Sequence, residues 1–304
     1  MPRYAVIDVG TNSVKFHIGE RRQDDTWRTV TDRAEITRLG EGLQESGEIN
    51  SAAMERTVAA VAAMATEAQD NGVTAIAAVG TMGMRTARNS QKFIDAVQQR
   101  CGVRIEIIPG EEEGRLAYLA VKSGLGFAEG SLAIFDTGGG STQFTFGRGS
   151  SVEEQFSLNV GAVRFSEKYG LGGVVSPAHL SAALDAIDGD LVRIDRRPSP
   201  DALVGMGGAI TNITAVMLRL AKYDPNVVQG SLIKRAEIER QIELYRSCSM
   251  DDRRKIVGLQ PKRADVILAG ACIVKTVMDK LRKDRLSVSD RGLRHGLLID
   301  RFAS

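Results

Sequence analysis

The chain has 304 residues, of which 43% are apolar and 26% charged, and its formal net charge is +2. This length suits two ordinary α/β domains, and the longest apolar run, residues 266–274, is far shorter than the roughly 20 residues of a membrane-spanning helix. Cys101, Cys248 and Cys272 have no paired spacing, so we expect buried thiols rather than a disulfide framework or a zinc site.

Apolar periodicity and turn residues predict a first half in the order strand, strand, strand, helix, strand, helix, strand, helix. Strands are expected at residues 4–7, 14–19, 26–37, 75–79 and 103–108, and helices from Ser51 to Gly72, from Ser90 to Gly102 and through EEEGRLAYLAVKSG.

The second half begins in the same way. It predicts strands at residues 132–135, 142–146 and 152–157, then helices, a strand at ALVG, a helix at AITNITAVMLRLAKY, a strand at RLSVS and a closing helix. The repeated order indicates an internal duplication with 128 residues between Asp8 and Asp136. We therefore predict an α/β protein with two domains that face each other across an interdomain cleft, residues 1–124 and 125–304. The last helix, at about residues 291–304, is a candidate to pack back on the first domain.

Each half opens with a strand, an aspartate and a loop of small residues. Such a loop presents backbone N–H groups that can bind phosphate oxygens. One loop by itself could be only a hairpin turn, but two loops at equivalent positions favour phosphate binding. The residues that we expect to bind phosphate are Gly10, Thr11, Asn12 and Ser13 in the first half and Gly138, Gly139, Gly140, Ser141 and Thr142 in the second.

Asp8 and Asp136 stand at the ends of the two strands, where a carboxylate would repel phosphate. A hard cation such as Mg²⁺ between carboxylate and phosphate would remove this conflict, so we expect both residues to be metal ligands, through water.

A third glycine cluster, LVGMGGAITNI, runs from a strand into a helix and contains Gly207 and Gly208. It is consistent with an anion at a helix N-terminus and equally with close packing of helix on strand. The dinucleotide-binding pattern G-x-G-x-x-G and the P-loop pattern are both missing, which argues against nicotinamide and P-loop chemistry.

Taken in order, the segments YAVIDVGTNSVKFHI, IEIIPGEEEGRLAYLAV, LAIFDTGGGSTQF, SLNVGAVRFSEKY and LVGMGGAITNI resemble the motifs of the exopolyphosphatase and guanosine pentaphosphate phosphohydrolase family. The resemblance implies two ribonuclease-H-like domains of the actin, sugar-kinase and heat-shock-ATPase superfamily. It also implies Mg²⁺-dependent removal of terminal phosphate from inorganic polyphosphate or guanosine pentaphosphate, and a possible homodimer.

The resemblance assigns roles to single residues. It makes Glu113 the base that activates water, Asp136 and Asp8 the metal-side carboxylates, and Arg85 a phosphate ligand. Periodicity alone does not separate Glu112 from Glu113, since both fall in register with Leu116. Relatives commonly read ATSA(V/L)R where this chain has GTMGMR, so the loop beside the phosphates is expected to differ in shape. We expect no counterpart of the C-terminal phosphohydrolase-like domain of the longer relatives.

Charge is uneven along the chain. From Asp190 onward there are 22 Lys and Arg against 14 Asp and Glu, and before it 18 against 24. This favours either a polyanion-binding surface or solvated helix faces. The residues of the possible polyphosphate track are Arg253, Arg254, Lys255, Lys262, Arg263, Arg291 and Arg294.

Alternative functions and partners remain open at this stage. A nucleoside-triphosphate hydrolase or a small-molecule kinase of the same superfamily would share the phosphate loops, and so would an ATP-driven binding module. The first residues lack a signal-peptide pattern, which favours a cytoplasmic protein, and we expect neither nucleic acid nor a membrane as a partner. His17, His179 and His295 are expected to be structural.

Overall fold

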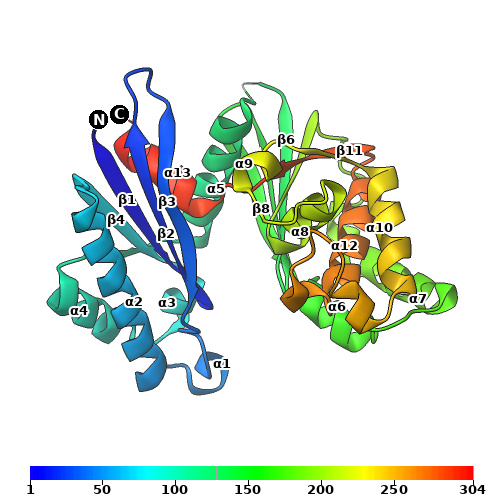
Figure 1. Cartoon of the computed structure of the whole chain (residues 1–304), viewed down its shortest axis with the longest axis horizontal. Helices are drawn as coiled ribbons and strands as arrows, with labels where there is room; N and C mark the ends of the chain where they lie inside the picture. Colours follow the sequence, from blue (N-terminus) through cyan, green and yellow to red (C-terminus); the bar gives the residue numbers. More distant parts are fainter. Residues whose placement is uncertain (128, 304) are drawn as a thin grey trace. The chain divides into compact units, whose positions relative to one another are not determined.

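The computed structural model describes residues 1–127 and 129–303, apart from the side chain of Gln44. The chain folds into two compact units. Unit 1 comprises Met1–Ala120 and Gly292–Ser304, and unit 2 comprises Val121–Arg291. Each unit is a mixed α/β structure built on its own sheet (Figure 1).

Unit 1 has a five-stranded sheet in the order β3-β2-β1-β4-β5, with β1 antiparallel to β2 and parallel to β4. Its elements are β1 Arg3–Val9, β2 Ser13–Arg21, β3 Trp27–Ile36, α1 Leu43–Ser46, α2 Ser51–Asp70, β4 Ala75–Gly80, α3 Met82–Thr86, α4 Ser90–Cys101, β5 Ile105–Ile107, most of α5 Gly110–Leu125, and α13 Leu293–Phe302.

The two faces of this sheet follow from the period of two along β1. Ala5, Ile7 and Val9 are buried in the cluster that includes α2 and α4. Val6 points the other way and is buried with Leu116 of α5 and with Leu297 and Leu298 of α13. Asp8 has the parity of Val6, so β1 directs it to the face that α5 and α13 cover.

Unit 2 has a six-stranded sheet in the order β10-β11-β9-β6-β7-β8. Its elements are β6 Ser131–Thr137, β7 Thr142–Arg148, β8 Ser151–Leu158, α6 Ala162–Lys168, α7 Pro177–Asp190, β9 Ala202–Met206, α8 Gly208–Met217, α9 Pro225–Val228, β10 Leu232–Lys234, α10 Arg235–Ser247, α11 Met250–Arg253, α12 Ile267–Lys280 and β11 Arg285–Ser289, with 3₁₀ turns at Val192–Ile194 and Pro261–Arg263.

The same strand order occurs in both sheets. The order β3-β2-β1-β4-β5 in unit 1 corresponds to the order β8-β7-β6-β9-β11 in unit 2. Strand β10 is an additional strand at the edge of the second sheet. Along β6, Ala133 and Phe135 face the main core of unit 2, and Asp136 has the opposite parity. The α/β fold and its duplication, expected from the sequence, are confirmed.

Three expectations about local structure were wrong. The strand predicted at residues 103–108 is only Ile105–Ile107, and the helix predicted at AITNITAVMLRLAKY ends at Met217. All three cysteines are free thiols, but only Cys272 is buried, which raises the pKa of its thiol to about 12.

No helix in the described part of the chain is long and apolar enough to cross a membrane.

Candidate active site

The loop after β1 is a four-residue turn in which three carbonyl groups, those of Thr11, Asn12 and Ser13, accept hydrogen bonds. The N–H of Gly10 donates to the carbonyl of Ser13 at 3.0 Å. The carbonyls of Thr11 and Asn12 accept hydrogen bonds of 2.8–3.1 Å from N–H groups in residues 37–40. Within the described chain, the N–H groups of Thr11 and Asn12 donate to no backbone carbonyl. The turn therefore leaves the N–H groups of Thr11 and Asn12 as donors for an anion.

The loop after β6 repeats this design in unit 2. The N–H of Gly138 donates to the carbonyl of Ser141 at 2.9 Å, and the carbonyls of Gly138 and Gly139 accept bonds of 2.9–3.1 Å from the N–H groups of residues 162–164 in α6. The N–H groups of Gly139, Gly140 and Ser141 have no backbone acceptor among the described residues. Two turns with one hydrogen-bond pattern, 128 positions apart, are consistent with one ligand type.

A glycine allows α6 to approach this second loop. A Cβ atom on Gly161 would stand 2.3 Å from the carbonyl oxygen of Gly139, too close for any larger residue. The start of α6 is therefore held directly against the loop.

Asp8 is paired across the hairpin with Lys15. The two residues are opposite each other in the β1–β2 register, and the Lys15 Nζ lies 3.4 Å from the Asp8 Oδ2. The Asp8 side chain is 4% exposed, so its charge is shielded from water. Sequence reasoning missed Lys15, although a four-residue loop from Gly10 to Ser13 brings residues 8 and 15 into register.

Glu113 lies in the first turn of α5 and is hydrogen-bonded by the guanidinium of Arg85 from α3. Burial raises the pKa of the Glu113 carboxyl above its ordinary value, and Arg85 opposes this shift only in part. The negative charge of Asp8 raises this pKa further, and the positive charge of Lys15 lowers it. Asp8, Lys15, Arg85 and Glu113 therefore form one electrostatic cluster in unit 1. A partly buried carboxylate with a raised pKa suits a general base.

The neighbouring Glu112 has different contacts. Both of its carboxylate oxygens accept hydrogen bonds of 2.7 Å from Arg115, which also bonds Asp300 of α13 at 2.6 Å. The bonds from Arg115 lower the pKa of Glu112. Glu112 therefore belongs to an ion-pair network that joins α5 to α13, while Glu111 is exposed.

In unit 2, Asp136 lies against the glycine turn after β9. Gly207 has φ of +87°, and a Cβ atom there would stand 2.1 Å from the Asp136 Oδ1. The guanidinium of Arg263 lies over Gly208, with its nitrogens 2.7–3.2 Å from the position of a Cβ on that glycine. The third glycine cluster therefore adjoins Asp136 and an arginine.

The possible polyphosphate track in the C-terminal half is not formed as predicted, because several of its residues have other contacts. Arg253 is fully buried, and its guanidinium donates to the carbonyls of Leu171, Gly173, Tyr245 and Ala264 at 2.6–3.0 Å. Arg254 and Lys255 pair with the aspartates three residues earlier in α11. Arg294 forms two hydrogen bonds to Asp32.

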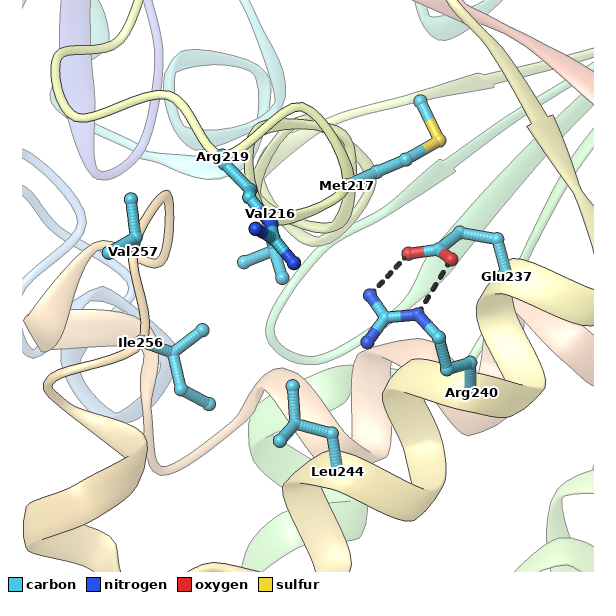
Figure 2. Close-up of a pocket in the computed structure, with 8 residues that line it drawn as sticks. All are labelled: Val216, Met217, Arg219, Glu237, Arg240, Leu244, Ile256 and Val257. Carbon is cyan, nitrogen blue, oxygen red and sulfur yellow. Dashed lines mark hydrogen bonds and ion pairs between the residues drawn. The ribbon is translucent and has the colours of Figure 1, made fainter.

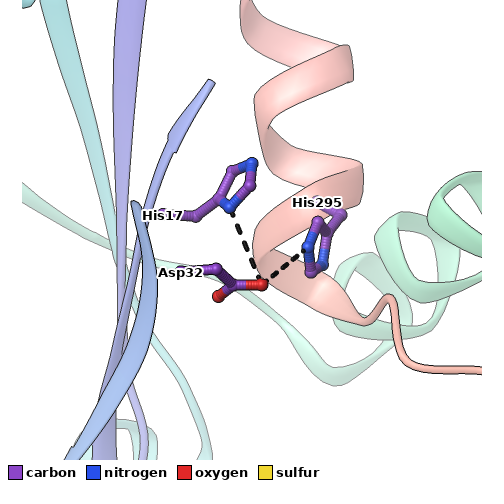
Figure 3. Close-up of side chains that lie close together, drawn as sticks. All are labelled: His17, Asp32 and His295. Carbon is purple, nitrogen blue, oxygen red and sulfur yellow. Dashed lines mark ion pairs between the residues drawn. The ribbon is translucent and has the colours of Figure 1, made fainter. Parts of the chain in front are cut away.

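Two of the histidines expected to be structural meet around Asp32 in unit 1. The His295 Nε2 lies 3.2 Å and the His17 Nδ1 3.8 Å from the Asp32 Oδ2 (Figure 3). The three ligand atoms are close enough to hold a metal ion. However, the His295 Nδ1 accepts a hydrogen bond from the N–H of Gly292, so its proton lies on Nε2 and points at Asp32. With Arg294 on both oxygens of Asp32, the cluster fits an anchor for α13 better than a metal site.

A hollow of about 490 Å³ lies between α8, α10 and the loop after α11 (Figure 2). Arg240 and Glu237 pair with each other on its wall at 2.7 and 2.8 Å. The rest of its lining is Val216, Met217, Arg219, Leu244, Ile256 and Val257.

The sequence model of the Ppx/GppA phosphatase family matches residues 18–304. The chain belongs to this family. A crystal structure of the Ppx/GppA phosphatase of Aquifex aeolicus is 31% identical and has a TM-score of 0.92, covering 99% of this chain and all of that one.

Two curated relatives of this chain differ in their named activities. A guanosine-5'-triphosphate,3'-diphosphate pyrophosphatase of Photobacterium profundum is 28% identical over 98% of this chain, which spans 59% of that protein. Exopolyphosphatase 1 of Mycobacterium leprae is 26% identical over 99% of this chain, which spans 90% of that protein. Membership of the family therefore leaves the substrate of this chain open.

Proposed function

We propose that this chain is a hydrolase that removes the terminal phosphate from inorganic polyphosphate or guanosine pentaphosphate with Mg²⁺. The observation that carries the proposal is the pair formed by Glu113 and Arg85: a carboxylate with a raised pKa held beside a guanidinium. The names of the relatives support this substrate class.

In the proposed reaction, Glu113 accepts a proton from water and the water oxygen attacks the terminal phosphorus. The bond from that phosphorus to the bridging oxygen breaks, and the shortened chain leaves with the bridging oxygen. Arg85 neutralises charge on the phosphate. In each unit, loop N–H groups without a backbone acceptor would bind phosphate oxygens: Thr11 and Asn12 in unit 1, and Gly139, Gly140 and Ser141 in unit 2.

The residues present fit the proposed Mg²⁺. Asp8 and Asp136 each end a central strand beside a phosphate loop, and carboxylate oxygen is the ligand type that Mg²⁺ prefers. Bound at either carboxylate, the ion would neutralise phosphate charge. We expect Asp8→Asn and Asp136→Asn to lose activity without unfolding, with partial rescue by excess Mg²⁺ in the milder variant. Undiminished activity of the wild type in a chelator would contradict the metal assignment.

The test of the function is phosphate release in ¹⁸O-labelled water from long polyphosphate, guanosine pentaphosphate and ATP. We expect one labelled oxygen in each released phosphate and no need for an acceptor. Phosphate transfer that requires an added hydroxyl compound would instead identify a kinase. ATP cleaved faster than both other substrates would identify a nucleoside-triphosphate hydrolase. A cytoplasmic location and a homodimer remain predictions from the sequence and the resemblance.

A further inference from the structure

A cavity of about 730 Å³ opens beside the phosphate loop of unit 2. Its lining consists of Gly139 and Gly140 from the loop and Val163, Arg164, Glu167 and Lys168 from α6. The hydrogen bonds from residues 162–164 to Gly138 and Gly139 fix the cavity wall to the loop. The cavity therefore continues from the N–H groups that are proposed to hold the terminal phosphate.

We propose that Arg164 and Lys168 bind the second and later phosphates of an inorganic polyphosphate chain. This inference rests on the proposed function and specifies its substrate. Arg164 and Lys168 are one helical turn apart, about 6 Å along the axis of α6, so they follow one face of the helix away from the loop. Successive anionic groups of one extended chain can contact both.

The two cations are available for a ligand. Both side chains are exposed, and neither has a carboxylate within 4 Å among the described residues. The Lys168 Nζ lies 5.2 Å from the centre of the Tyr169 ring, a contact that positions the ammonium without neutralising it. Glu167 is the one acidic residue of the lining, so the cavity keeps a net charge of +1.

The lining favours a phosphate chain over a nucleoside. It offers backbone N–H groups, a guanidinium and an ammonium, which are all phosphate ligands. It contains no aromatic ring on which a base could stack and no side-chain amide that could read the edge of a base. A guanosine group would therefore gain little in this cavity.

The test measures binding of the intact chain to polyphosphate of about one hundred units and to tripolyphosphate, in chelator and at several salt concentrations. For the long chain, we expect Arg164→Gln and Lys168→Gln each to lower affinity several-fold and to reduce the slope of log K against log salt by about one. Lys168→Gln should leave tripolyphosphate binding nearly unchanged, because the short chain ends before it.

Two further variants test whether long-chain affinity depends on the charge of this cavity. Glu167→Gln removes the negative charge from the same cavity and should raise affinity for the long chain. Lys255→Gln removes an exposed cation that pairs with Asp252 at 3.4 Å, and should change nothing. The proposal is overturned if Arg164→Gln and Lys168→Gln bind the long chain like the wild type, or if Lys255→Gln weakens it equally.

Phosphate release by the same proteins separates this inference from the proposed function. If the wild type hydrolyses polyphosphate and the α6 variants bind it normally, the proposed function stands and the proposed roles of Arg164 and Lys168 are refuted. If the wild type binds long chains through Arg164 and Lys168 but releases no phosphate, the roles of these two residues stand and the proposed hydrolase activity is refuted.

Discussion

The guanidinium of Arg85 donates a hydrogen bond to the carboxylate of Glu113, and its Nη1 also donates to the carbonyl of Ile108 at 2.6 Å. One side chain thus ties α3 to the start of α5 and fixes the orientation of the carboxylate. Burial raises the pKa of Glu113, and the hydrogen bond and positive charge of Arg85 lower it in part. The contact therefore sets both the position and the basicity of the proposed base.

Glu113→Gln should reduce the rate of phosphate release by about 10²- to 10⁴-fold, because the amide keeps the size of the side chain but accepts no proton. Binding of polyphosphate should persist. Glu112→Gln is the matched control and should stay within a few-fold of the wild type, since Glu112 is engaged with Arg115. The reverse ranking in a phosphate-release assay would move the base to Glu112.

The acidic limb of the pH profile of kcat/KM should lie above the usual range of a glutamate, since the base must be deprotonated and burial raises its pKa. Asp8 raises this pKa and Lys15 lowers it. Lys15→Gln should therefore move the limb to higher pH. An unchanged limb, or a shift to lower pH, would be incompatible with a limb set by Glu113.

Gly207→Ala should abolish activity and lower stability. The left-handed φ of +87° is strained for alanine, and the added Cβ would overlap the Asp136 Oδ1. Gly189→Ala, within α7 and with open space around the Cβ, is the matched control and should be harmless. Activity and thermal unfolding of both variants check this, and normal turnover by Gly207→Ala would show that the position of Asp136 does not matter.

Arg253→Gln should destabilise unit 2 by roughly 3 kcal/mol or more, because buried carbonyls lose charged hydrogen-bond donors. Arg254→Gln, an exposed neighbour, should change the free energy of unfolding by less than about 0.5 kcal/mol. Urea unfolding measures both. A stable Arg253→Gln protein with a reduced salt slope for polyphosphate would restore the basic track.

Asp32→Asn should cost about 3 kcal/mol at pH 7, since it leaves the mostly buried Arg294 without its ionic partner. Burial tends to raise the pKa of Asp32, but the hydrogen bonds from His295 and Arg294 outweigh it and hold the pKa well below its usual range. A depressed carboxyl pKa stabilises the fold above the unfolded value of about 4 and loses this contribution as pH falls below it. The difference in unfolding free energy between wild type and variant should therefore shrink towards pH 3. A constant difference across this range would refute the linkage.

Much of the fold could be predicted because each hairpin has a regular apolar alternation and a short polar loop. The same loops, repeated with an aspartate before them, also indicated phosphate. The end of α8 was beyond this reasoning, since the apolar pattern continues through Leu218 and Leu220. The helix stops because Arg219 adopts φ of +53° and the N–H of Leu220 bonds back to the carbonyl of Ala215 at 3.0 Å.

Individual charged residues were less predictable than elements. In DDRRK, the sequence shows three adjacent cations but not that Arg253 turns into the core. The cations of α6 resemble an ordinary solvated face, and only the hydrogen bonds from α6 to Gly138 and Gly139 place them beside a phosphate loop. Distinguishing Glu112 from Glu113 likewise needs the contact partners of each.

Helix α13 has a consequence for biosynthesis. It covers one face of the first sheet, where Leu297 and Leu298 are buried with Val6 and Val79, although residues 121–291 of the other unit separate it from those strands in the chain. While a ribosome is still translating unit 2, the nascent first unit has this apolar face uncovered. Unit 1 therefore completes its fold only when residues 293–302 emerge, after all of unit 2 has been synthesised.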